Sequence, residues 1–325
     1  MTKLALFALA VTGFPIAVLG SHPPLAQTCH NTKPSLSCSL SAQSALVNSC
    51  CVETLGGLVL STQFWSTYTG LEASKQLLPQ DSWTLHGLWP DFCNGSWTQY
   101  CDLTRQYDPH PAPNTTTGTP QGISVPAYGG VTVDTFLAAL GKKGKGLLKW
   151  MDRFWIAQDQ PNTELWAHEF SKHATCFSTF GGSCFSKRDL DRHVDLLEYY
   201  AVAVEYFERL PTWKWLAEKG VVPRNSTGYS LGDIQEALKE RHGGLPWIGC
   251  AGPRWNQTSA GKGSTDAGRT VLTEVWYYYH VYGRVQDGKG KPVGADVNGG
   301  SVSSCAKARD AVWYYERSGG SERAV

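Results

Sequence analysis

The sequence carries few charges for its length, which limits the classes of protein that it can encode. Charged residues make up 18% of its 325 residues, and 29 basic side chains are balanced by 28 acidic ones. A protein that holds nucleic acid by bulk electrostatics needs a basic face or stripe, and a net charge of +1 does not favour one. An enzyme that handles one or two phosphates locally is not excluded by this balance.

The chain also lacks the motifs of several common classes. No G-x-S-x-G occurs, so a serine nucleophile on a strand-to-helix turn is not indicated. No paired C-x-x-C motifs occur, so a zinc knuckle is not indicated. After the N-terminus no run of 18 apolar residues occurs, so the mature protein is expected to have no transmembrane helix. Hydrophobic residues still make up 42% of the chain, which is enough for a sizeable core.

Residues 1–26 predict a secretory signal peptide. Lys3 supplies a positive start, and the apolar run over 4–19 is followed by small residues and prolines. Cleavage near residues 20–26 would leave a secreted mature chain; a vacuolar or lysosome-like destination would use the same signal. The catalytic domain is therefore expected to span 27–325.

Two further features agree with the secretory route. The ten cysteines indicate up to five disulfide bonds, because that route is oxidising. N-x-S/T sequons indicate a glycoprotein and occur at Asn94, Asn114, Asn225 and Asn256.

The residue pattern predicts a single α+β domain with a central antiparallel sheet, helices packed on it and disulfide staples. Stretches rich in β-branched and aromatic residues predict strands over 57–65, 83–86, 271–283 and 312–315. Gly87 and Pro90 are expected to end the second of these. No regular βαβ alternation occurs, which argues against a doubly wound sheet. Residues 104–131, rich in Pro, Thr and Gly, are expected to form a surface loop.

Helices are predicted between these strands. One pair should cover 133–140 and 147–155, separated by a lysine-rich turn at 142–146. Capping-box spacings at Ser186/Asp189 and Ser230/Asp233 predict two helix starts. The first of these should open one amphipathic helix, with apolar positions on one face at Leu190, Val194, Leu197, Ala201 and Val204.

One histidine lies in an unusual setting near the end of a predicted strand. His86 stands in WTLHGLWP at 83–90, directly before Gly87. The backbone is open beside a glycine, so a polar ring there has access to a site. A single histidine is more often structural than catalytic, so a functional role for His86 requires a second group of reactive side chains elsewhere in the chain.

A second cluster lies within LWAHEFSKHATC at 165–176. In a helix, His168, Glu169, Lys172 and His173 would share one face. A solvated face with a Glu–His pair is the simpler interpretation. Apolar neighbours on the same segment favour partial burial instead, and burial beside charges perturbs pKa values.

Three chemistries could use such a cluster. Zinc hydrolysis needs histidines at i and i+4, whereas His168 and His173 are five apart and therefore about 100° out of phase. Acyl transfer lacks a nucleophile, because no cysteine is expected to stay free. Acid–base cleavage of a phosphodiester needs two imidazoles and a cation, and His86, His173 and Lys172 supply them.

The segments WTLHGLWP and HEFSKHATC together resemble the two active-site segments of the ribonuclease T2 family, which are secreted acid ribonucleases. The resemblance covers most of the mature chain, and the stretch 57–65, the cysteine pair at 50–51 and the ten-cysteine layout look like the fungal branch. It implies a metal-free, cofactor-free endoribonuclease for single-stranded RNA. In such enzymes the 2′-OH attacks the adjacent phosphorus, and the resulting 2′,3′-cyclic phosphate is hydrolysed to a 3′-phosphate.

The resemblance also implies residue roles. His86 and His173 would form the acid–base pair; we favour His173 as the base and His86 as the acid, although the sequence does not fix this direction. Glu169 and Lys172 would stabilise the pentacoordinate phosphorane. His168 would bind phosphate.

Base binding is implied at other positions. Trp89, Asp91 and Trp97 would form the first base site, with Trp97 where the family usually has Tyr. Gln63 is a further candidate. Leu165 stands where a second base site often has an aromatic ring, and leucine cannot stack as one.

The family's cysteine order implies a disulfide pairing of Cys29–Cys51, Cys38–Cys93, Cys50–Cys184, Cys101–Cys176 and Cys250–Cys305. The expected state is a monomer with RNA as its partner. A catalytically silent recognition glycoprotein on the same fold is the alternative, which retention of His86, His173, Lys172 and Glu169 disfavours.

Overall fold

The computed structural model of the chain describes residues 29, 31–251 and 269–323. The predicted signal peptide at 1–26 and the Asn256 sequon lie outside these residues. The other sequon residues, Asn94, Asn114 and Asn225, are all exposed. Among the helices of the described residues, none is long and apolar enough to cross a membrane.

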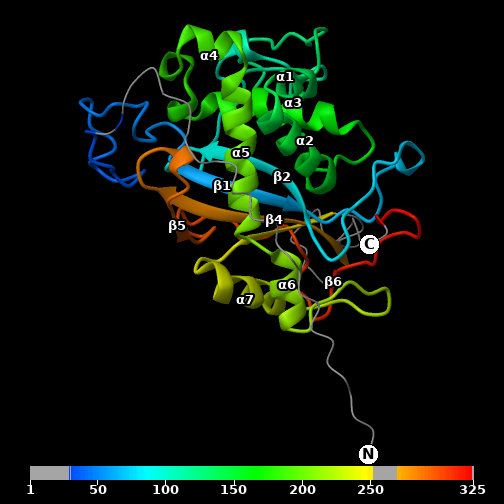
Figure 1. Ribbon diagram of the computed structural model, residues 1–325. Coiled ribbons are helices and arrows are strands. Elements are labelled where there is room, and N and C mark those ends of the chain that lie inside the picture. Colours follow the sequence, from blue (N-terminus) through cyan, green and yellow to red (C-terminus); the bar gives the residue numbers. More distant parts are fainter. Residues whose placement is uncertain (1–28, 30, 252–268, 324–325) are drawn as a thin grey trace, which may run out of the picture.

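A six-stranded sheet forms the centre of the fold (Figure 1). Its strands are β1 (Leu58–Phe64), β2 (Thr84–Asp91), β3 (Trp247–Ala251), β4 (Thr270–Val281), β5 (Gly290–Val293) and β6 (Val312–Trp313). Antiparallel pairs give the order β2-β1-β4-β3, and β5 and β6 also pair with β4. The predicted α+β class is confirmed; within the sheet, the short β6 differs by running parallel to β4.

Strand β2 is longer than the sequence predicts. It continues through Gly87 and Pro90 to Asp91, so the prediction that these residues end the strand is wrong. β2 lies at one end of the strand order. An edge strand tolerates proline because one side of its backbone has no neighbouring strand to bond.

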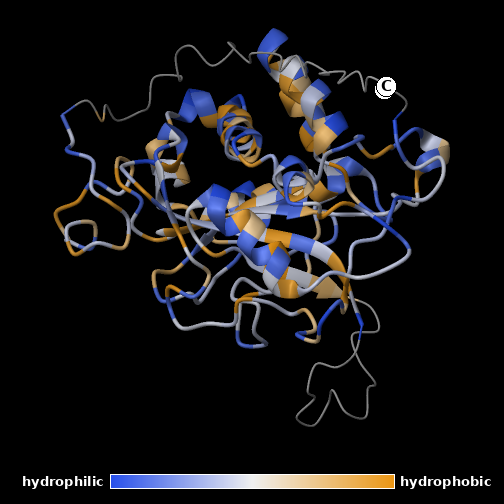
Figure 2. Cartoon of the chain, turned by 90° about the horizontal axis from the view of Figure 1, so that it is seen from below, coloured by the Kyte–Doolittle hydropathy of each residue, from blue (hydrophilic) through white to orange (hydrophobic). Residues whose placement is uncertain are grey.

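The helices are α1 (Val133–Ala139), α2 (Lys142–Phe154), α3 (Asn162–Lys172), α4 (Lys187–Asp191), α5 (Val194–Glu208), α6 (Thr212–Glu218) and α7 (Leu231–His242). α5 packs against β1 and β2. Figure 1 shows α1 to α4 gathered near one end of α5, and α6 and α7 near the other. In Figure 2 the helices carry both hydrophilic and hydrophobic positions, as expected of elements with one side against a core.

The lysine-rich stretch at 142–146 is helical, contrary to the prediction of a turn. The chain reverses at Gly141, whose φ of 72° suits glycine, and α2 begins at Lys142. A Cβ on Gly144 would lie 1.8 Å from the Leu137 carbonyl oxygen, so this glycine lets the start of α2 pack directly against α1.

The predicted amphipathic helix after Ser186 is divided in two. Ser186 caps α4 as expected, since its Oγ accepts from the Asp189 N–H at 3.1 Å. α4 ends at Asp191, and His193, with a φ of 56°, separates it from α5. α5 is buried on most of its surface, so the single apolar face predicted for it is too narrow.

Five disulfide bonds tie segments around the sheet, and they join Cys29–Cys51, Cys38–Cys93, Cys50–Cys184, Cys101–Cys176 and Cys250–Cys305. These are the pairs that the family resemblance implies. Cys93 and Cys101 follow β2, and Cys176 follows α3. Two of the bonds therefore hold the ends of the segments that carry the candidate site.

The segment 104–131 is irregular, as predicted, but it is not a surface loop throughout. Arg105 and Asp108 near its start are buried, at 6% and 2% exposure. Arg105 donates to Asp195 at the start of α5 at 3.2 Å. The beginning of this segment therefore belongs to the packed interior, and its later part lies at the surface.

Candidate active site

A β-bulge on β2 directs His86 toward the candidate site. Thr62 of β1 pairs with Gly87, and the next residue, Gln63, pairs with Leu85, so His86 is the extra residue. Leu85 and Leu88 are both fully buried in the core. The bulge breaks the strict alternation of the strand and brings His86 to the side of Trp89, which lines the same cavity.

Contacts on three sides fix the position of His86. Its Nδ1 lies 2.7 Å from Glu274 Oε1 on β4. Its ring stacks on Phe64 with centroids 3.6 Å apart. Its carbonyl oxygen accepts from Trp155 Nε1 at 2.7 Å. Burial lowers the pKa of His86, and the Glu274 carboxylate opposes this effect.

Glu169 of α3 is fully buried beside β2. Trp89 Nε1 donates to its Oε2 at 2.7 Å. Its other oxygen, Oε1, lies 3.5 Å from His86 Nε2 and has no hydrogen-bond partner among the described residues. Burial raises the pKa of Glu169 to about 8, against the opposing effect of the Trp89 hydrogen bond. The carboxyl is therefore mostly protonated below that pH.

Gly87 leaves room for Glu169. A Cβ at residue 87 would lie 1.8 Å from Glu169 Oε2 and 2.6 Å from Trp89 Nε1. No side chain fits in that space, so the helix carboxyl reaches the strand only because residue 87 is glycine. The glycine that the sequence suggested as a strand end is instead the contact point of α3 with β2.

Lys172 and His173 lie at the C-terminal end of α3. Lys172 Nζ donates to the Ala112 carbonyl oxygen at 3.3 Å, and burial lowers the pKa of its ammonium. His173 is the C-cap residue, and its ring stacks on Trp89 with centroids 4.8 Å apart and an angle of 18°. Burial holds the pKa of His173 well below its usual 6.5, with Lys172 as the next cause.

His168, one turn earlier on α3, has its own carboxylate partner. Its Nδ1 lies 2.7 Å from Asp108 Oδ2, which also accepts from the Tyr100 hydroxyl at 2.8 Å. These contacts lower the pKa of Asp108 against the effect of burial, so the carboxylate stays charged beside the ring. The ring of His168 lies 6.2 Å from that of His173, centroid to centroid.

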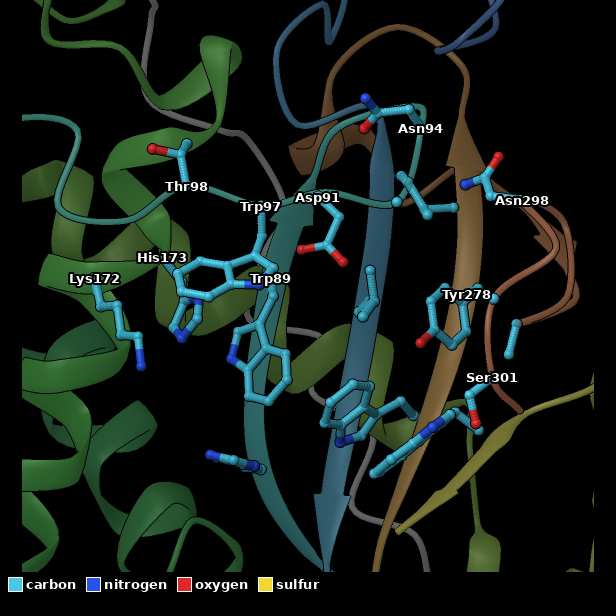
Figure 3. A pocket seen from close by; sticks show the side chains of 18 of the residues that line it. Trp89, Asp91, Asn94, Trp97, Thr98, Lys172, His173, Tyr278, Asn298 and Ser301 are labelled. Atoms are coloured by element: carbon cyan, nitrogen blue, oxygen red, sulfur yellow. The ribbon is translucent and has the colours of Figure 1, made fainter. Parts of the chain in front are cut away.

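Two cavities adjoin this group of side chains. The larger, of about 480 Å³, includes Trp89, Asp91 and Trp97. The smaller, of about 310 Å³, includes Phe64 and Leu165. His86 and His168 line both cavities. Figure 3 shows the larger cavity, with Lys172 and His173 at one side and Tyr278 and Asn298 at the other.

Three side chains of α3 and its cap are close enough to hold a metal ion. Ligand atoms of His168, Glu169 and His173 lie within 4.8 Å of one another. Metal ligands must be deprotonated, and the raised pKa of Glu169 opposes this. Nδ1 of His168 is also already bonded to Asp108. The arrangement therefore suits proton transfer better than metal binding.

Comparison with known proteins decides the family. The model of the Ribonuclease T2 family matches residues 56–289. The chain belongs to the ribonuclease T2 family. It is an endoribonuclease of that family, and both candidate active-site segments lie within the matched range.

Two relatives and one solved structure show the extent of the similarity. Ribonuclease Le2 of Lentinula edodes is 33% identical over 85% of this chain and 94% of its own. A ribonuclease T2-like protein of Aspergillus fumigatus is 34% identical over 79% of this chain, which spans half of that longer protein. The crystal structure of Actibind, described as a T2 ribonuclease, superposes with a TM-score of 0.63 at 26% identity, covering 90% of this chain and 98% of that one.

In this ribonuclease, three of the residues predicted to bind a base, Trp89, Asp91 and Trp97, line the larger cavity. Trp97 is 52% exposed, so its ring has a free face for stacking. Burial raises the pKa of Asp91 to about 7. Trp89 differs from Trp97, because one face of its ring is covered by His173 and its N–H is bonded to Glu169. Trp89 positions the ionisable groups as well as lining the cavity.

Gln63 is not part of the ribonuclease site, which corrects the prediction from sequence. Its side chain is fully buried, donates to the Leu210 carbonyl at 3.0 Å and accepts from the Thr212 hydroxyl at 2.7 Å. The bulge at His86 shifts the register between β1 and β2 next to Gln63. Gln63 borders a separate cavity near α6 and lines neither of the two that flank the histidines.

Two carboxylates of the ribonuclease site were missed from the sequence. Glu274 lies within a strand of mostly apolar residues, and 188 positions separate it from His86. Asp108 lies in the segment predicted to be a surface loop, 60 positions before His168. A polar residue inside the strong strand pattern at 271–283 is the signal that could have drawn attention to Glu274.

Proposed function

We propose that this ribonuclease cleaves single-stranded RNA by transphosphorylation through a 2′,3′-cyclic phosphate, which it then hydrolyses to a 3′-phosphate. The observation that carries the proposal is the position of His86 and His168, which line both cavities at once. A phosphodiester bound at the histidines would place one flanking base in each cavity. Unpaired bases are suited to this, because they can leave the stack and lie on aromatic rings.

The acid–base pair in this proposal is His173 and His86. His173 has a strongly lowered pKa, so it is neutral and can accept the proton of the 2′-OH. The 2′-oxygen bonds to phosphorus, and the bond from phosphorus to the 5′-oxygen breaks. His86 gives its Nε2 proton to the departing 5′-oxygen. In the hydrolysis step the two roles reverse, with water in place of the departing alcohol.

Glu169 and Lys172 would stabilise the charge that develops on the phosphoryl oxygens. A protonated Glu169 donates a hydrogen bond, and the Lys172 ammonium supplies positive charge. Glu169 is fully buried and Lys172 is partly buried, and such interactions are stronger in these surroundings than in water. His168, held by Asp108, would bind the phosphate.

The direct test uses a purified, fully disulfide-bonded sample, a single-stranded RNA dinucleotide and EDTA. We expect cleavage with a 2′,3′-cyclic phosphate detected by ³¹P NMR, followed by the 3′-phosphate. A 2′-O-methyl dinucleotide should stay intact because it lacks the attacking hydroxyl. No cleavage of RNA would overturn the proposal. Cleavage that occurs without EDTA and stops with it would mean that the reaction depends on a metal ion.

We further propose that the mature protein is a secreted, glycosylated monomer. The sequence pattern at 1–26 and the exposed sequons at Asn94, Asn114 and Asn225 support this. Five disulfide bonds agree with an oxidising compartment. Mass spectrometry of the exported protein before and after glycosidase treatment, with light scattering, checks all three points.

A further inference from the structure

Glu274 reaches the site from the middle of the sheet. In β4 it pairs with Phe64 of β1 on one side and Gly249 of β3 on the other. A Cβ on Gly249 would lie 2.8 Å from the Glu274 Cβ, so the glycine leaves space for the carboxylate. The Glu274 side chain is 18% exposed, and its Oε1 forms an ion pair with His86 Nδ1 at 2.7 Å. Strand β4, paired with β1 and β3 at this position, therefore carries the carboxylate that contacts a histidine on the edge strand β2.

We propose that Glu274 is a positioning residue for the reaction: it holds the Nδ1–H of His86, so that Nε2 faces the substrate and carries the proton for the leaving 5′-oxygen. The inference rests on the proposed function. The other ring nitrogen, Nε2, already points to the site, because it lies 3.5 Å from Glu169 Oε1. A hydrogen bond at one imidazole nitrogen determines the protonation of the other.

The contrast with His173 supports this assignment. In the described part of the chain, ion pairs join His86 to Glu274 and His168 to Asp108, and none joins His173 to a carboxylate. A carboxylate beside an imidazole stabilises its protonated form. A histidine with such a partner is suited to give a proton, and one without it is suited to accept a proton.

Several charged groups act on His86, and Glu274 is the main one that favours its protonated form. His168 and Lys172 both disfavour a positive charge on the ring. Glu169 approaches within 3.5 Å, but its raised pKa makes it mostly neutral at acid and neutral pH. Phe64, stacked on the ring, carries no charge. Removing the charge of Glu274 should therefore make His86 a stronger acid with a smaller protonated fraction.

The test compares Glu274→Gln with wild type and with Glu236→Gln, an exposed residue of α7 that serves as the control for loss of one charge. Two substrates are used: an RNA dinucleotide and a nucleoside 3′-(4-nitrophenyl phosphate). The 4-nitrophenoxide leaves as a stable anion and needs no proton from a general acid. Activity is measured across pH, with thermal melting as the readout of stability.

For Glu274→Gln we expect kcat on the dinucleotide to fall by about tenfold to hundredfold, within the usual contribution of a general acid, with little change in KM. On the nitrophenyl substrate the variant should stay close to wild type. The alkaline limb of kcat/KM on the dinucleotide should move to lower pH by about one unit, since removal of an opposite charge lowers the pKa of His86. Glu236→Gln should match wild type throughout.

An equal loss on both substrates, or an unmoved alkaline limb, would overturn the role of Glu274, even if the melting temperature falls. Full activity of Glu274→Gln at every pH would do the same. Failure of the wild-type enzyme to cleave RNA would overturn the proposed function instead, so the two failures can be told apart. Glu274→Ala, which removes the hydrogen bond as well as the charge, should show a larger loss with the same dependence on the leaving group.

Discussion

The two halves of the active site are built in different ways. The half on α3 is local, since His168, Glu169, Lys172 and His173 lie within six consecutive residues at the end of one helix. The half on β2 is assembled from distant parts of the chain. His86 depends on a bulge against β1, a carboxylate on β4 and a hydrogen bond from Trp155, which follows α2.

This difference determines how easily a substitution elsewhere in the protein displaces the side chains of each half. The helix sets the spacing of its four side chains by its own period, so that they stay together wherever the helix lies. The geometry of the strand half depends on three other elements being in place. The predictions that follow compare the halves, beginning with the largest expected effect.

Replacing either histidine of the proposed acid–base pair should have the largest effect. His86→Phe and His173→Phe should each lower kcat/KM on a dinucleotide by about 10³-fold, because each removes one proton-transfer group. His280→Phe on β4, outside both cavities, is the matched control. Circular dichroism checks that the fold is kept. If only one of the two replacements abolishes turnover, His86 and His173 do not act together as the acid and the base.

Filling the space that lets Glu169 of the helix half contact β2 at Gly87 should have the next largest effect. In Gly87→Ala the new Cβ collides with Glu169 and Trp89, and we expect kcat to fall by about 10²-fold because catalytic geometry tolerates little displacement. Gly232→Ala on α7 is the control, since a Cβ there meets nothing within 4 Å. That control should raise stability by about 0.5–1 kcal/mol in chemical denaturation. Wild-type kcat in Gly87→Ala would show that α3 does not need this close approach.

The pH dependence should reflect both halves. His173 must be neutral to accept a proton, so activity rises with pH through its pKa, which lies well below 6.5. His86 must be protonated to give one, so activity falls as pH rises through its pKa, which burial also lowers. We expect a bell-shaped kcat/KM profile with its optimum on the acid side of pH 6.5, falling by about tenfold per pH unit beyond the alkaline limb. An optimum near pH 8 would contradict these shifts.

Removing the charge of Asp108, the carboxylate that contacts His168 of the helix half, should have the smallest effect. Asp108→Asn keeps an acceptor for Tyr100 but removes the negative charge beside His168. We expect KM for a dinucleotide to rise by about fivefold, equivalent to about 1 kcal/mol of binding, with kcat nearly unchanged. Glu274→Gln should show the opposite pattern, with kcat reduced and KM kept. The same pattern in both variants would mean that the two carboxylates do not have separate roles.

Much of the fold could be predicted because its signals are local. The β-branched and aromatic content of β1 and β4 and the capping box at Ser186 depend on neighbouring residues only. The cluster on α3 also follows from helical spacing. The errors occur where tertiary packing decides, as at Gly144, where the contact with Leu137 of α1 keeps a glycine within a helix.

The strand half shows why the rest could not be predicted. The bulge at His86 exists only in the pairing of two strands, so WTLHGLWP alone does not show which way each side chain points. Gln63 on β1, which the resemblance suggested as a further base-binding candidate, is likewise directed into the core, where it contacts Leu210 and Thr212. Glu274 and Asp108 lie far in sequence from the histidines that they contact, and only the folded structure brings them together. A single sequence does not show which distant residues will be in contact.

The disulfide bond between Cys101 and Cys176 has a consequence for proteolysis. It closes a loop that contains the exposed residues 119–121, and exposed loop tips are preferred sites of proteolytic cutting. After a cut there, this bond and Cys50–Cys184 would still join the two fragments, one with His86 and the other with α3. The nicked enzyme should run as one species on a non-reducing gel and as two after reduction. Outside the cell, such damage would leave both halves of the site covalently attached to each other.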